Sequence, residues 1–265
     1  MRDIALTLAA ALLALSLGSP VPADEASPEA SSGFSSVRGL YALFYTTEGS
    51  FACRLFEDRA YNNIRNFIDL ACGYRTWTDP RTDEERREPY YDGLLIYSVT
   101  RNAMLVGGDP LANGLGSPGY HIDDEIHDDL RFDVPGRLGM ANLGGQPNTN
   151  SGTWFVTAAP LPELDGRYTI IGEVVQGLNV VRRITRVAAN RQGRPLEDIV
   201  VERIDIIRVL EGGEVVAYER STSHPFAEVD AIPMAQRLTS GPTWRSGDSE
   251  FPLPELPPIY GPLPE

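Results

Sequence analysis

Short apolar runs, each bounded by turn-forming residues, recur through the middle of this 265-residue chain and constrain its fold more than any other feature. Runs of this length with such boundaries are typical of strands. We expect strands at residues 40–45, 51–56, 94–99, 138–141, 154–157, 168–175 and 199–209. Many short strands with few helices predict a mainly β barrel or sandwich.

Two segments have helical patterns instead. Residues 60–71 place Ile64, Phe67, Ile68 and Ala71 on one face, and Gly73 follows as a C-terminal stop. A second helix is expected at residues 178–185. Between the first helix and the next strand, residues 79–89 are predicted to form a polar loop whose charge run is solvated surface.

The composition is that of a soluble globular domain, with 42% hydrophobic and 23% charged residues. The length fits one domain with tails, or two small domains. A formal net charge of -14 argues against nucleic acid or an anionic membrane surface as the partner, because both require a basic face. The partner is expected to be neutral, basic, or a short peptide.

Both ends of the chain differ from the middle. Residues 1–23 have the pattern of an export signal, with Arg2, an apolar run and a small-x-small cleavage site before Asp24. The apolar run is too short for a membrane anchor, so we predict a periplasmic or secreted protein. Residues 24–38 are expected to be a disordered leader, 39–210 the folded domain, and 211–265 an extension with a Pro-rich disordered tail.

Cys53 and Cys72 are the only cysteines. An oxidising compartment would permit them to pair, and the alternative is two buried thiols, since the sequence does not fix the distance that a disulfide requires. The stretch 121–129 is rich in His, Asp and Glu, but its spacing is not that of an EF-hand loop. We interpret it as a solvated acidic loop and predict neither metal nor cofactor. Trp154 is expected to pack inside the barrel.

A series of short motifs shares its order and spacing with one family. The motifs are Tyr91-Asp92-Gly93, Gly107-Gly108-Asp109, Met140-Ala141-Asn142, Pro147-Asn148-Thr149-Asn150 and Leu164-Asp165-Gly166-Arg167. Each has a local explanation in turn geometry, but that explanation leaves their joint order unaccounted for. In the order and spacing of these motifs, the chain resembles the cyclophilin-type peptidyl-prolyl cis-trans isomerases over about residues 41–209.

The resemblance implies a closed eight-stranded antiparallel barrel capped by two α-helices. It also implies catalysis of rotation about the bond before proline, whose barrier is about 18–20 kcal/mol. Such a site needs neither nucleophile nor metal, but it must bind the twisted amide better than either planar form. The implied partners are proline-containing peptides or protein segments, bound by a monomer.

Several residues match the family's substrate-binding positions. Met104, Phe155 and Leu164 keep apolar character at positions of the proline pocket. Ala141 and Asn142 match the segment that holds the peptide backbone. Tyr168 stands where many members have His, and it still supplies a polar edge. These matches favour retained peptide binding.

Other positions depart from the family. The catalytic Arg position is Ser98, a pocket Phe position is Ala103, and two substrate-binding Gln positions are Val106 and Thr153. Glu163 replaces a Trp, and Gly145-Gln146 resembles a short insertion in the peptide-facing loop. Losing one preorganised donor to a transition state typically costs about 100- to 1000-fold in rate.

These departures leave alternative functions open. One hypothesis is an exported isomerase with weakened activity, and the other is a catalytically inactive peptide- or protein-binding module. A third is a scaffold whose Pro-rich tail binds the partner, testable by truncation after Leu210. Arg101 is close to Ser98 in sequence, but strand alternation places it on the opposite face unless the chain bulges.

Overall fold

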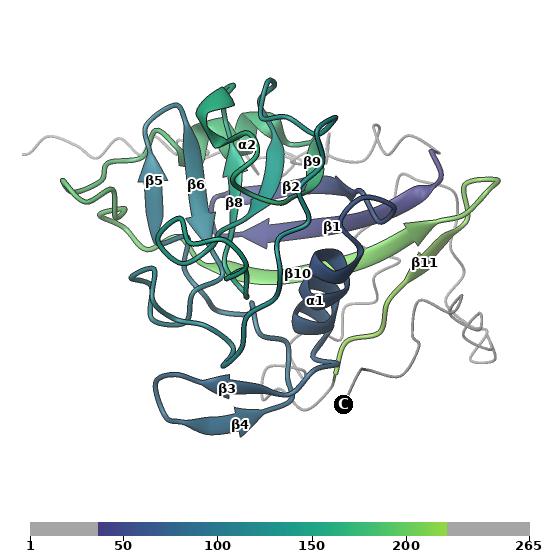
Figure 1. Ribbon diagram of the computed structural model, residues 1–265, viewed down its shortest axis with the longest axis horizontal. Coiled ribbons are helices and arrows are strands. Elements are labelled where there is room, and N and C mark those ends of the chain that lie inside the picture. The colour runs from purple at the N-terminus through teal and green to yellow at the C-terminus, as the bar shows by residue number, and fades with distance from the viewer. Residues whose placement is uncertain (1–36, 222–265) are drawn as a thin grey trace, which may run out of the picture.

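A long antiparallel sheet and two helices form the part of the protein that the computed structural model describes, residues 37–221. Figure 1 shows α1 in front of β10, and α2, which contacts β2, at the top of the molecule. The elements are β1 (Gly39–Thr46), β2 (Gly49–Leu55), α1 (Tyr61–Cys72), β3 (Trp77–Asp79), β4 (Glu84–Arg86), β5 (Ser98–Thr100), β6 (Met104–Gly107), β7 (Arg137–Met140), β8 (Trp154–Thr157), a 3-10 turn (Pro162–Leu164), β9 (Ile170–Gln176), α2 (Leu178–Ile184), β10 (Val201–Val209) and β11 (Val215–Ala217).

The main sheet has nine strands in the order β11-β10-β1-β2-β9-β7-β8-β6-β5. Within residues 37–221 its edge strands β11 and β5 do not pair with each other. A single bridge between Leu95 and Val200 joins the segments that precede β5 and β10, and the Ile96 N–H donates to the Ile199 carbonyl at 2.8 Å. The mainly β fold with two helices is confirmed. The closed eight-stranded barrel is not confirmed. The sheet has nine strands, and an isolated bridge, not a strand pair, joins the segments before β5 and β10.

Most of the predicted elements are present. Both helices are confirmed. α1 ends at Cys72 and is capped by Gly73, whose φ of 74° favours glycine and where an added Cβ would lie 2.7 Å from the Glu88 backbone. The run at 94–99 is a strand only from Ser98, and none of the expected strands corresponds to β6 or β11.

Trp154 lies in the main core, as expected for barrel packing. It is fully buried, and its ring meets Phe44 edge-on with 5.0 Å between centroids. Phe44 in turn stacks on Phe51 across the β1 and β2 pair at 4.5 Å. These rings fix the centre of the core on which the sheet is built.

The two cysteines are unpaired and buried, Cys53 in β2 and Cys72 at the end of α1. Burial raises the pKa of both thiols, that of Cys72 to about 12. They are therefore packed as small apolar side chains and not as reactive thiolates.

The predicted export signal, nearly all of the predicted leader and the Pro-rich end of the tail lie outside the described residues. Localisation therefore stays a prediction. Between residues 37 and 221 no helix is long and apolar enough to cross a membrane, and no group of three or more His, Cys, Asp or Glu side chains could hold a metal ion.

Residues 211–221 pack on the domain. β11 pairs with β10, and the Ser221 N–H donates to the Cys72 carbonyl at the end of α1 at 2.8 Å. Arg220 forms an ion pair with Asp92 and approaches Asp205 at 3.8 Å. The extension thus ties the end of α1 to β10.

The acidic stretch 121–129 is only partly the solvated loop that we predicted. Asp123, Asp128 and Asp129 are exposed, but Asp124 and Glu125 are half-buried. The Glu125 carboxylate accepts hydrogen bonds from the Asn62 and Asn63 N–H groups at 3.1 and 2.9 Å. This part of the loop is packed because α1 begins after Ala60, which supplies no side-chain cap of its own.

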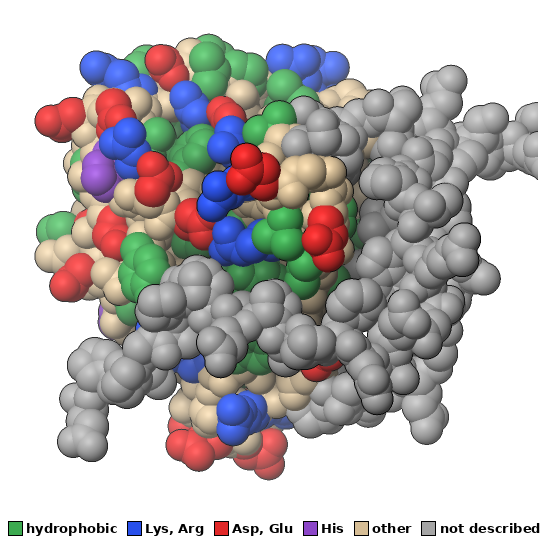
Figure 2. Space-filling model, turned by 90° about the vertical axis from the view of Figure 1, so that its right-hand side faces the viewer, with side chains coloured by type: hydrophobic (Ala, Val, Ile, Leu, Met, Phe, Trp, Pro, Cys, Tyr) green, Lys and Arg blue, Asp and Glu red, His purple; other side chains and the backbone are tan. Residues whose placement is uncertain are grey.

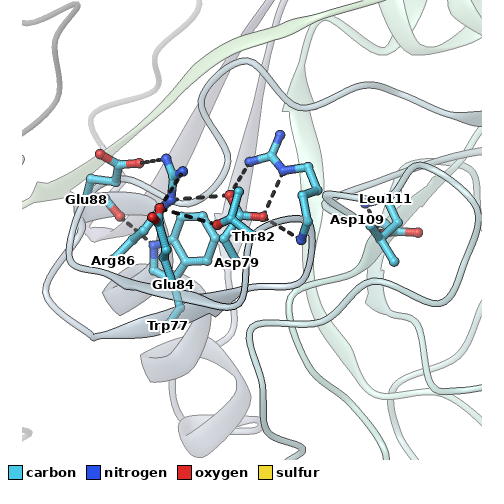
Figure 3. Close-up of polar contacts among 9 residues, drawn as sticks. Trp77, Asp79, Thr82, Glu84, Arg86, Glu88, Asp109 and Leu111 are labelled. Carbon is cyan, nitrogen blue, oxygen red and sulfur yellow. Dashed lines mark hydrogen bonds and ion pairs between the residues drawn. The ribbon is translucent and has the colours of Figure 1, made fainter.

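The segment predicted as a polar loop at 79–89 is instead the β3 and β4 hairpin, which projects from the lower end of the molecule in Figure 1. Figure 3 shows Asp79 at its centre, between two arginines. The buried Asp79 carboxylate accepts hydrogen bonds from Arg81 Nε at 2.8 Å and Nη2 at 2.7 Å, and Arg86 Nε lies 3.2 Å away. The ion pairs of Asp79 with Arg81 and Arg86 thus stabilise the hairpin. Elsewhere on the surface, Figure 2 shows acidic and basic side chains interspersed.

The hairpin predicts a pH-dependent stability. Hydrogen bonding to Arg81 lowers the pKa of Asp79, so its stabilisation is fully present above the unfolded carboxyl pKa of about 4 and is lost as pH falls through the folded pKa. We expect Asp79→Asn to lower the free energy of unfolding by about 1–3 kcal/mol at pH 7, with a smaller difference at acid pH. Urea titrations at several pH values measure this. Asp83→Asn, on the same hairpin, is the control, and equal effects of the two variants would contradict the account.

Candidate functional site

Cross-strand register brings several predicted site residues into one row. Ser98 in β5 lies opposite Val106 in β6, and Val106 lies opposite Phe155 in β8. Directly opposed residues of antiparallel strands point to the same face of a sheet. The row continues to Gly139 in β7, which lies opposite Phe155, and to Ile170 in β9, which lies opposite Gly139.

A second apolar cluster, separate from the main core, forms around this row. Phe132, Phe155 and Ile170 are buried in it. Partly buried side chains pack against them, and five of these were predicted for the site: Met104, Val106, Ala141, Leu164 and Tyr168. Phe155, also predicted for the site, lies at the buried centre. The cluster lies on the side of the sheet opposite the main core, and its partly buried members retain some exposed apolar surface.

Phe155 is held by rings and by a glycine. Phe132 stacks on it at 5.5 Å, and Tyr168 meets it edge-on at 5.5 Å. A Cβ at Gly139 would lie only 2.6 Å from the Phe155 ring, so the absence of a side chain in β7 makes the space that the ring occupies.

Asn142 begins a loop, residues 142–149, whose backbone turns beside the cluster. Its side-chain amide donates to the Arg167 carbonyl at 3.1 Å, and its Oδ1 accepts from the Gly145 N–H at 3.1 Å. Asn142 therefore shapes the loop with its side chain. Thr153, which is 8% exposed, joins the same region through its carbonyl, which accepts from the Ala141 N–H at 2.9 Å.

Ser98 and Ala103 lie at the β5 end of the site. Ser98 is half-buried, and the backbone of Gly193 approaches β5 by accepting the Val99 N–H at 2.7 Å. Ala103 closes the turn after β5, where its N–H donates to the Thr100 carbonyl at 2.9 Å. Unlike Met104, Ala103 is not a member of the apolar cluster. Arg101 is exposed in this turn, just beyond the end of β5, so strand alternation does not extend to it.

Several residues of the site were not predicted from the sequence, among them Phe132, Gly139 and Ile170. Phe132 follows the acidic stretch, and its N–H donates to Asp165 Oδ1 at 2.7 Å, which places its ring under Phe155. Gly139 and Ile170 enter through the pairing of β7 with β8 and β9. Period-2 alternation from Gly139 to Ala141 was the only local signal for Gly139.

The chemistry available to the cluster follows from its members. Apart from the Tyr168 hydroxyl, no side chain of the cluster is titratable. The arrangement can bind an apolar group beside a neighbouring backbone segment.

Comparisons with known proteins agree with this chemistry. A sequence model described as "Cyclophilin type peptidyl-prolyl cis-trans isomerase/CLD" matches residues 41–206. The chain is 43% identical over 168 residues to peptidyl-prolyl cis-trans isomerase B of Streptomyces anulatus, covering 62% of this chain and 95% of that protein. It is 36% identical over 167 residues to peptidyl-prolyl cis-trans isomerase A of Mycobacterium tuberculosis, covering 62% and 91%.

A solved structure is similar as well. It is a cyclophilin type peptidyl-prolyl cis-trans isomerase of Cryptosporidium parvum, crystallised in the presence of the dipeptide Ala-Pro. The two folds superpose with a TM-score of 0.54 at 26% sequence identity, covering 62% of this chain and 96% of that one.

The contact between Gly139 and Phe155 predicts the effect of a single methyl group. We expect Gly139→Ala to displace the Phe155 ring and to lower the free energy of unfolding by about 1–3 kcal/mol, because added volume in a packed cluster is destabilising. Aromatic NMR signals of Phe155, Phe132 and Tyr168 should shift together. Gly39→Ala in β1 is the control, since its nearest neighbours are side-chain atoms at 3.3 Å that can move. Unmoved aromatic signals in Gly139→Ala would contradict the packing described.

Proposed function

This chain belongs to the cyclophilin-type peptidyl-prolyl cis-trans isomerase family, and we propose that it is an isomerase of reduced catalytic power. The observation that carries the proposal is the apolar cluster built on Phe155, with Met104 and Leu164 against it. These three residues stand at the family's proline-pocket positions. A proline ring is the apolar group that such a cluster, lying beside an open backbone segment, is suited to bind.

The reaction requires only that the site favour the twisted amide. Rotation about the prolyl bond removes amide resonance, and the barrier of about 18–20 kcal/mol falls if the site binds the twisted form more tightly than the planar forms. In this account the cluster holds the proline ring while the backbone at Ala141 and Asn142 holds the peptide. The flanking chain is then free to rotate against a fixed ring.

Ser98 limits the rate. An Arg at this position would present several donors in a fixed planar fork, whereas Ser has one hydroxyl on a short side chain. Val106, opposite Ser98 in the row, likewise provides no hydrogen bond where the family has Gln. Each lost donor of this kind typically lowers the rate by about 100- to 1000-fold.

The substrates that we propose are proline-containing peptides or unfolded exported proteins. The export pattern at residues 1–23 supports periplasmic or secreted substrates. The presence of Ala-Pro with the similar Cryptosporidium parvum protein supports a small residue before the proline.

An inactive peptide-binding module is the second candidate. It is favoured by the location of the departures, because Ser98 and Val106 are direct neighbours across β5 and β6. In this reading the hydrogen-bond donors of the family's Arg and Gln are both missing from one part of the site, while the apolar cluster remains. Such a protein would bind prolyl peptides without accelerating their isomerisation.

Exchange NMR on a proline-containing peptide separates the two candidates. We expect the unmodified protein to accelerate cis-trans exchange weakly, and Ser98→Arg to raise the rate at saturating protein by at least about 10-fold, since one donor is worth about 100-fold or more in a fully adapted site. Thr100→Arg is the control, because it adds the same charge at an exposed position of the same strand.

Each outcome has a definite meaning. Binding without any acceleration by the unmodified protein would make it a binding module. Absence of both binding and acceleration would overturn the proposed function altogether. Equal gains in Ser98→Arg and Thr100→Arg would show that the position of Ser98 is not special.

A further inference from the structure

We propose that Asp124, in the acidic stretch 121–129, is a positioning residue that holds the peptide-binding loop 142–149 in its working conformation. The inference rests on the proposed function, since it assigns the loop to peptide binding. Asp124 lies outside the apolar cluster and none of the family motifs described above contains it. Its role follows from how it contacts Asn148.

Asp124 and Asn148 bind each other reciprocally. The Asp124 N–H donates to Asn148 Oδ1 at 3.0 Å, and the Asn148 N–H donates to Asp124 Oδ2 at 2.9 Å. Asn148 has a φ of 60°, in the left-handed region that few residues other than Gly and Asn adopt readily. Two hydrogen bonds from one partner therefore hold a backbone conformation that is otherwise unfavourable.

Asp124 can act as an anchor because its own segment is fixed on both sides. The Ile122 N–H donates to the Asn150 carbonyl at 2.8 Å. On the other side, the Glu125 carboxylate accepts the first N–H groups of α1, where the helix dipole favours negative charge. Asn63 Nδ2 also donates to Glu125 at 2.8 Å. The anchor is thus tied to the helix.

The loop needs such an anchor because its interior is permissive. Gly144 and Gly145 both have positive φ, and glycine restricts the backbone least. Inside the loop, Thr149 Oγ1 accepts the Leu143 N–H at 2.8 Å and donates to the Gln146 carbonyl at 2.7 Å. Since Thr149 follows Asn148, this internal bracing depends on where Asn148 is held.

The other end of the loop is fixed separately, through the bond from Asn142 to the Arg167 carbonyl. Tyr168 follows Arg167, and Thr169 Oγ1 accepts the Glu125 N–H at 2.8 Å. Both ends of the loop are therefore connected to the acidic stretch, the Asn148 end through Asp124 and the Asn142 end through the segment that contains Thr169. Release of Asp124 frees the Asn148 end of the loop and leaves the Asn142 end in place.

The test compares three variants of the full chain. Asp124→Ala removes the acceptor for Asn148, Asp124→Asn keeps an acceptor oxygen, and Asp128→Ala changes an exposed carboxylate of the same stretch. The measurements are the Kd of an Ala-Pro-containing peptide by NMR titration, the exchange rate at saturation, and hydrogen exchange of the Leu143 and Gly145 amides.

We expect Asp124→Ala to weaken peptide affinity by about 5- to 20-fold, because the variant loses the charge-assisted hydrogen bond from the Asn148 N–H and the loop must then be ordered on binding. The rate at saturation should change less than about 2-fold, because the apolar cluster is untouched. Protection of the Leu143 amide, which donates to Thr149 Oγ1, should fall, whereas the Gly145 amide, which donates to Asn142 Oδ1 at the end that stays in place, should change less. Asp124→Asn should restore most of the affinity, and Asp128→Ala should match the unmodified protein.

The proposal and the proposed function can fail separately. If the unmodified protein binds the peptide but Asp124→Ala binds it equally well, or keeps its amide protection, the positioning role is overturned. If the unmodified protein neither binds nor isomerises, the proposed function fails, and the role in peptide binding fails with it. The amide protection then still decides whether Asp124 holds the loop.

Discussion

The register of β8 against β6 and β7 is the constraint on which the rest of the site depends. Trp154 and Phe155 are consecutive, so they point to opposite faces of the sheet. Trp154 is buried in the main core against Phe44, and the two glycines Gly107 and Gly108 give its ring room, since a Cβ at either would lie within 3 Å of it. A slip of one residue would exchange the two faces, placing Phe155 in the core. Packing of Trp154 therefore fixes where Phe155 is presented.

This coupling explains how binding and catalysis can separate in one scaffold. The apolar cluster is maintained by the same register that builds the core, so it persists as long as the protein folds. In the proposed account the family's hydrogen-bond donors stand at the positions of Ser98 in the edge strand β5 and Val106 in β6, where a change of side chain leaves the strand register unaffected. Loss of catalytic power at low structural cost is therefore expected at these positions.

The sequence predicted what depends on local periodicity and on motif order. Both helices and most strands followed from patterns within a dozen residues, and the family motifs placed Met104, Phe155 and Leu164. The β3 and β4 hairpin was missed because its strands are short and charged and are held by Asp79 between arginines, an arrangement without apolar periodicity. The ninth strand and the open seam were missed because strand pairing is set by contacts between distant segments. For the same reason the sequence indicated neither Phe132 under Phe155 nor Glu125 at the start of α1.

The central claim is that the Phe155 cluster binds a proline ring whether or not the protein is an efficient isomerase. The most direct measurement is an intermolecular NOE experiment on the protein with an excess of an Ala-Pro-containing peptide. The account predicts contacts from the proline ring protons to Phe155, Met104 and Leu164. Contacts to a different part of the surface, or none at millimolar peptide, would contradict it.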